Sequence, residues 1–94
     1  MKTIEDYTDA ELEDVLLEFI SDNPLEWFTS LSDISLLEDW GLGEALIKYY
    51  EIKFNTIGNT FEAYFDIFSA TADTPLLATM RVIAKKHLHD IKNR

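Results

Sequence analysis

Hydrophobic residues in this 94-residue chain recur with two different periods, and this change of period restricts the possible folds more than any other feature. Near both ends they recur every three or four residues, as on one face of an α-helix. Between residues 47 and 67 they alternate with polar residues, as in a strand with one buried face. The sequence therefore predicts an α+β fold: an acidic helical N-terminal half, an antiparallel β-hairpin, and a C-terminal helix that packs on the sheet.

The first helix has a clear start signal. Thr8 and Glu11 have the spacing of a capping box, in which each side chain bonds a backbone N–H of the other residue. A buried stripe follows, and its members are Leu12, Val15, Leu16, Phe19 and Ile20. Pro24 ends the helix, because the residue before a proline disfavours the α conformation.

Two shorter helices are predicted next. One runs from Pro24 to about Leu31, and the other begins at Ser32 or Asp33 and ends at Trp40, with Gly41 as its C-cap. Gly41 and Gly43 would form a bend between the two halves of one domain that spans residues 1–94. The halves are residues 1–44, acidic and helical, and residues 45–94, hairpin plus helix.

The predicted hairpin covers about residues 46–69. Its first strand is Ile47–Phe54 and its second is Phe61–Phe68, with turn-forming residues between them. The second segment also fits a helical stripe, although its aromatic content favours a strand.

The C-terminal helix is predicted from Pro75 to about Ile91, with Thr74 as its N-cap. Its buried face would hold Leu77, Met80, Ile83 or Ala84, Leu88 and Ile91. A solvated stripe would hold Arg81, Lys85, His89 and Lys92, with Lys86 nearby.

The net charge differs strongly between the two halves of the chain. Residues 1–44 carry thirteen acids and one base, a net charge of −12, while residues 45–94 carry five acids and seven bases, a net charge of +2. Such a distribution opposes direct binding to nucleic-acid phosphates and anionic lipid, and it attracts basic protein surfaces. The excess acid could equally serve solubility alone.

The predicted partner-binding residues lie along one face of the first helix and continue beyond it. Glu11, Asp14, Glu18 and Asp22 form a line that we call the acidic stripe, and Glu26, Trp27 and Asp39 extend it. Among the aromatic residues, Trp27, Tyr49 and Tyr64 are expected to be exposed, because each lies beside charged residues.

No catalytic constellation is recognisable, and we expect no enzyme activity, no cofactor and no metal ligand. His87 and His89 are two residues apart on one predicted helix, so they do not face each other, and both are expected at the surface. The chain has no cysteine and no apolar stretch of about 20 residues, which favours a cytoplasmic protein without membrane contact.

Residues 39–88 resemble the NinX-like proteins of lambdoid phages. The resemblance rests on Asp39-Trp40, Gly43, Ile47, Ile52 and Phe61-Glu62-Ala63, and above all on Thr74-Pro75-Leu76-Leu77-Ala78-Thr79-Met80-Arg81. It implies a strand pair backed by a C-terminal helix and a phage origin. It supplies no catalytic residues.

Two functions are compatible with these features. The first is a phage-encoded inhibitor in the host cytoplasm, which binds a basic surface of a nucleic-acid-handling defence complex, such as a CRISPR complex, with mimicry of phosphates as one mechanism. The second is a non-inhibitory structural or assembly protein that forms a homodimer through its hairpin edge or its exposed aromatic side chains.

Overall fold

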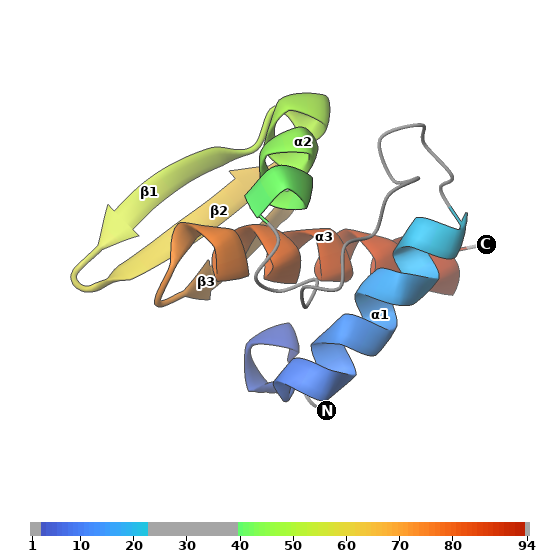
Figure 1. Ribbon diagram of the computed structural model, residues 1–94. Helices are drawn as coiled ribbons and strands as arrows, with labels where there is room; N and C mark the ends of the chain where they lie inside the picture. Colours follow the sequence, from blue (N-terminus) through green and yellow to red (C-terminus); the bar gives the residue numbers. More distant parts are fainter. Residues whose placement is uncertain (1–2, 23–39, 94) are drawn as a thin grey trace.

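A computed structural model describes residues 3–22 and 40–93 (Figure 1). Its elements are the 3₁₀-helix η1 (Ile4–Asp6), the helices α1 (Asp9–Asp22), α2 (Trp40–Tyr50) and α3 (Pro75–Lys92), and the strands β1 (Lys53–Ile57), β2 (Thr60–Phe65) and β3 (Phe68–Ala72). The strands form one antiparallel sheet in the order β1-β2-β3, and α3 packs against β2 and β3. The predicted α+β class, with a C-terminal helix on the sheet, is confirmed.

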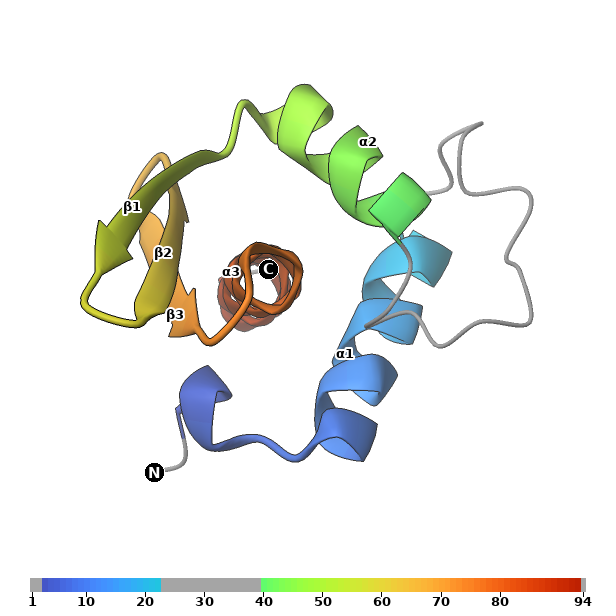
Figure 2. The same ribbon diagram turned by 60° about the vertical axis from the view of Figure 1, so that its left-hand side comes forward.

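Helix α3 is the centre of the molecule. Figure 2 looks along its axis and shows the sheet, α2, α1 and η1 arranged around it. The buried residues of α3 therefore lie on several sides of the helix, and they are Leu76, Ala78, Thr79, Met80, Val82, Ile83, Ala84 and His87. The predicted start at Pro75 is confirmed, and the Thr74 hydroxyl accepts a hydrogen bond from the Leu77 N–H at 3.1 Å. The prediction of a single buried face was too narrow, because neighbours surround the helix.

Helix α1 matches its prediction in both ends and buried side. The Glu11 N–H donates to the Thr8 hydroxyl at 3.2 Å, and the Thr8 N–H donates to the Glu11 carboxylate at 3.0 Å, which is the reciprocal capping box. Leu12, Leu16 and Phe19 are buried. Both features depend on nearby residues, which explains why they could be predicted locally.

Helix α2 corrects two predictions. Residues 47–50 are helical rather than the start of a strand, and Gly41 and Gly43 lie inside the helix rather than in a bend after one. Gly43 lies so close to Leu76 of α3 that a Cβ atom at this position would force the Leu76 side chain to move. The glycine therefore serves close packing of the two helices. The short helices predicted for residues 24–40 lie outside the described residues, except for Trp40.

Helix α2 ends at Tyr50, and the residue that follows, Glu51, has a left-handed φ of 53°. The next N–H, of Ile52, donates to the Ile47 carbonyl at 3.0 Å, and the buried Ile52 side chain anchors the turn to the core.

The sheet has three strands where the sequence predicted two. The segment 61–68 is extended, as favoured, but it contains a tight turn at Asp66 and Ile67 that separates β2 from β3. Up to Phe65 the predicted alternation is correct. The turn then reverses the phase, so that Ile67 is 76% exposed while Phe68 packs against the core.

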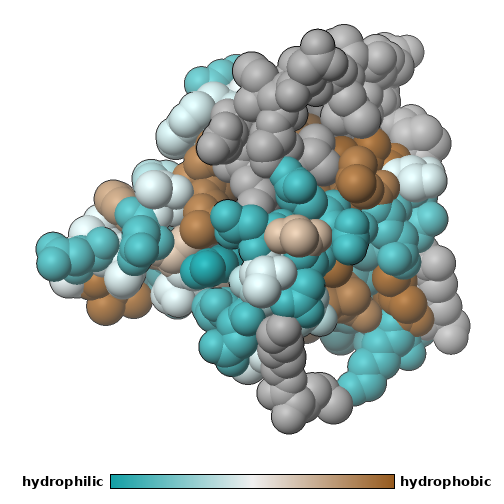
Figure 3. Space-filling model, turned by 60° about the horizontal axis from the view of Figure 1, so that its bottom comes forward, coloured by the Kyte–Doolittle hydropathy of each residue, from teal (hydrophilic) through white to brown (hydrophobic). Residues whose placement is uncertain are grey.

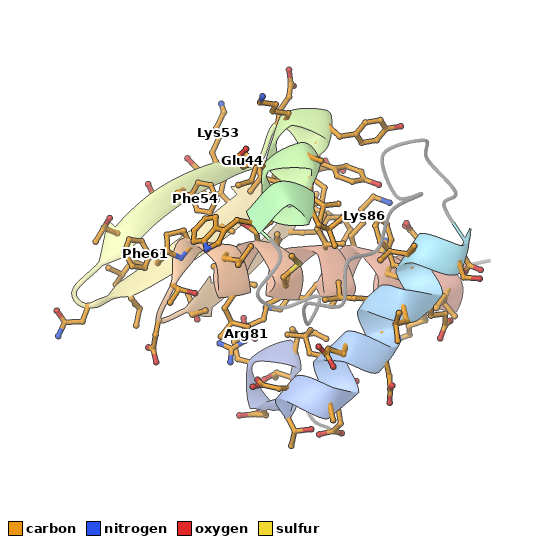
Figure 4. The ribbon with its side chains drawn as sticks, viewed as in Figure 1. Glu44, Lys53, Phe54, Phe61, Arg81 and Lys86 are labelled. Carbon is orange, nitrogen blue, oxygen red and sulfur yellow. The ribbon has the colours of Figure 1, made fainter. Side chains whose placement is uncertain are left out.

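The outer edge of β3 is covered by charged side chains. The Thr71 N–H donates to Glu5 at 3.3 Å, Arg81 donates to the Thr71 carbonyl at 2.7 Å, and Lys85 donates to the Ser69 carbonyl at 2.7 Å. Figure 4 shows the Arg81 side chain directed from α3 toward the side of the molecule that carries η1. The prediction that Arg81 and Lys85 belong to a solvated stripe was wrong: both are half-buried and close a strand edge.

Glu5 gives this edge a defined pH dependence. Burial alone would raise the pKa of its carboxyl, but hydrogen bonds from Lys85 and from backbone N–H groups, with the charge of Lys85 at 2.7 Å, hold that pKa below the ordinary 4.5. A carboxyl whose pKa is lowered by folding stabilises the protein above its unfolded pKa, and this contribution disappears as the pH falls through the folded pKa.

We therefore expect Glu5→Gln to lower the free energy of unfolding at pH 7. The difference from the unmodified protein should shrink as the pH falls below about 4.5, because both side chains are then neutral. Urea unfolding at a series of pH values measures it, with the exposed Glu44→Gln as control. A pH-independent difference would mean that Glu5 acts through packing rather than through its charge.

Candidate functional site

Four of the seven predicted partner-binding residues lie in the part of the chain that the structure describes. Asp14, Glu18 and Asp22 are exposed on one side of α1, whereas Glu11 is half-buried and engaged in the capping box. The predicted extension to Glu26, Trp27 and Asp39 lies outside the described residues. Figure 3 shows hydrophilic side chains over much of the face that carries η1 and α1, interrupted by hydrophobic ones.

The acidic stripe borders the buried stripe of α1, and at its C-terminal end it meets α3. There Oε1 of Glu18 lies 3.4 Å from Nε2 of His87, and Oδ2 of Asp22 lies 4.0 Å from the same nitrogen. The three donor atoms lie within 4.8 Å of one another. We call Glu18, Asp22 and His87 the carboxylate–histidine cluster.

The predicted exposure of His87 was wrong. The residue was expected at the surface, but only 2% of its side chain is exposed, and its Nε2 has no hydrogen-bond partner. The buried ring of Phe19 meets the imidazole edge-on, with 5.8 Å between the ring centroids and 79° between the planes. Burial and this contact together hold Nε2 facing the two carboxylates. His89, by contrast, is exposed as predicted.

One nitrogen and two carboxylate oxygens can act in two ways. A protonated imidazole would form an ion pair with the carboxylates, while a neutral imidazole with its proton on Nδ1 would offer the Nε2 lone pair to a cation. Sequence reasoning missed this group because His87 lies more than 60 residues after Glu18 and Asp22 in the chain. Only the Glu18 and Asp22 spacing, four residues on one helix, was visible beforehand.

Two aromatic side chains of α2 are exposed as well. Tyr49 and Trp40 are exposed, which confirms the prediction for Tyr49, whereas Tyr64 is half-buried and its predicted exposure was wrong. An open hollow of about 290 Å³ lies between the end of α2 and β2, and its lining residues are Tyr50, Glu51, Lys53, Tyr64, Phe65 and Asp66. Burial, with the nearby Tyr49 and the negative charge of Asp90, raises the pKa of the Tyr50 hydroxyl.

Two further findings concern membrane spans and similarity to known proteins. Among the described residues, no helix has both the length and the apolar composition that crossing a membrane requires. Comparison with models of protein families, with curated proteins and with solved structures finds no match. The resemblance of residues 39–88 to NinX-like phage proteins stays a prediction.

Proposed function

We propose that this chain is a phage-encoded acidic binding protein that inhibits a host complex which handles nucleic acids, and that the acidic stripe of α1 is part of its binding surface. One observation carries the proposal. Residues 3–22 contain eight acidic side chains and no lysine or arginine, and six of the eight belong to α1. Asp14 and Glu18 are both exposed there.

Three basic side chains of α3 support this reading by the partners they have. Lys85 pairs with Glu5, and Lys86 pairs with Asp90 on its own helix while its ammonium lies 5.6 Å from the Tyr50 ring centroid. Arg81 donates to a backbone carbonyl. These cations are thus engaged outside α1, which leaves its negative field directed toward solvent and toward any basic surface that approaches.

The spacing of the acids limits how far mimicry of a nucleic acid can extend. Asp14, Glu18 and Asp22 follow one another at about 6 Å along the helix axis, whereas duplex DNA carries one charge per about 1.7 Å. Attraction to a basic protein surface needs only the local field. Competition with phosphates would further require that Glu26 and Asp39 extend the same surface.

Asp14→Lys tests the proposal without touching His87 or its neighbours. The partner is first captured from a lysate of the bacterial host and identified by mass spectrometry, and its association with the chain is then measured at several salt concentrations. We expect association with the variant to be severalfold slower at low salt and the difference to vanish near 1 M salt, where the Debye length is about 3 Å.

Glu44→Lys is the matched control, because it changes the net charge equally from an exposed position on α2. If both variants slow association to the same degree, net charge rather than the acidic stripe governs binding. If neither does, the stripe is a solubility feature. Labelled duplex DNA added to the captured partner tests inhibition, since the chain should displace it.

A homodimeric assembly protein is the second candidate. It is favoured because, among the described residues, only one of the two edges of the sheet is covered by side chains. The outer edge of β3 is covered by Glu5, Arg81 and Lys85, but β1 is the other edge strand and four of its five residues are exposed. Light scattering distinguishes the candidates. A dimer formed through β1 persists in about 0.5 M salt, whereas charge-driven partner binding weakens.

A further inference from the structure

We propose that Glu18, Asp22 and His87 form a binding site for a divalent transition-metal ion, and that Zn²⁺ is the ion these donors fit best. The inference does not depend on the proposed function. It rests on two independent observations: donor atoms from two helices converge within 4.8 Å, and the one that is almost fully buried, Nε2 of His87, has no hydrogen-bond partner.

The buried nitrogen is the stronger of the two observations. Most buried polar atoms in proteins have a hydrogen-bond partner, and leaving one without a partner costs free energy. His87 is 2% exposed, Phe19 packs against its ring, and its Nε2 faces two carboxylates. A bound cation would satisfy this nitrogen and both carboxylates together.

The distances are close to those that a metal requires. Zinc binds imidazole nitrogen and carboxylate oxygen at about 2.0–2.2 Å, so that neighbouring donors in a tetrahedral site lie about 3.4 Å apart. The atoms of Glu18 and His87 are already 3.4 Å apart, and Asp22 is 4.0 Å from His87. Asp22 is the last residue of α1, and its Oδ2 would have to approach Nε2 by about 0.6 Å to reach this spacing.

The types of donor select among metals. Imidazole suits zinc and its transition-metal neighbours, whereas magnesium and calcium prefer sites made only of oxygen. Two carboxylates balance the charge of a divalent ion. Because the Glu18 side chain is 57% exposed, one side of the site is open, and a water molecule can complete the coordination. The bound ion would join α1 to α3.

Titration of the untagged full chain with zinc chloride, followed by calorimetry, tests the site. We expect one ion per chain and a zinc-dependent rise in melting temperature. Glu18→Gln and Asp22→Asn should each weaken binding by at least about tenfold, because loss of even indirect metal contacts costs about 10–100-fold. Glu44→Gln, the same substitution on an exposed helical position, should leave it unchanged.

Nitrogen NMR of the imidazoles identifies the ligand, since zinc should shift Nε2 of His87 and leave His89 unaffected. The two carboxylate variants decide the question even if His87→Gln fails to fold, because both carboxylates are exposed. Zinc binding that survives both variants, that requires His89, or that fails to saturate at one ion per chain would overturn the proposal. In each of those cases the cluster is an ion pair only.

Discussion

Leu16→Ala is expected to lower the free energy of unfolding by about 2–5 kcal/mol, the usual cost of removing a large buried aliphatic side chain and leaving a cavity. Leu16 is 1% exposed, lies in the middle of α1 and belongs to the core cluster that includes Met80 of α3. A domain of this size has only about 5–15 kcal/mol of total stability. The substitution therefore removes a large part of it.

Leu17→Ala is a control on the neighbouring residue, since Leu17 is 48% exposed and the chemical change is identical. Its effect should stay within about 0.5 kcal/mol. Urea denaturation of both variants measures the difference, and Met80→Ala should resemble Leu16→Ala because Met80 is fully buried. Equal effects at positions 16 and 17 would mean that the side of α1 with Leu12, Leu16 and Phe19 is not the buried one.

Ala63→Leu is expected to cost about 1–3 kcal/mol, although alanine itself is depleted in strands. Ala63 is fully buried in the central strand β2, opposite Ala70 of β3, on the side of the sheet that α3 covers. Ala78 and Ala84 of α3 are also fully buried. These small side chains let the helix approach the sheet closely, and three added carbons have no space there.

Ser69→Leu is the control for this second variant. Ser69 lies on the next strand but is exposed, so the added side chain can extend into solvent. Thermal melts should show a clear loss for Ala63→Leu and little change for Ser69→Leu. Comparable melting temperatures for the two variants would indicate a looser contact between α3 and the sheet than the burial of Ala63 implies.

The parts of the fold that the sequence determined are those governed by residues close together in the chain. Thr8 with Glu11 defines the start of α1, and Thr74 with Pro75 defines the start of α3. Hydrophobic residues three and four apart define the buried side of α1. Caps and stripes act over one or two helical turns, so they operate in the same way whatever the rest of the chain does.

Tertiary structure alone decided the remaining features. Residues 47–50 alternate like a strand, but they also continue the helical stripe of Leu42 and Leu46, and packing against α3 through Gly43 selects the helix. The burial of His87 and its approach to Glu18 and Asp22 arise because α3 is surrounded on several sides. A residue's exposure depends on which distant elements cover it, and nothing in its neighbouring sequence records that.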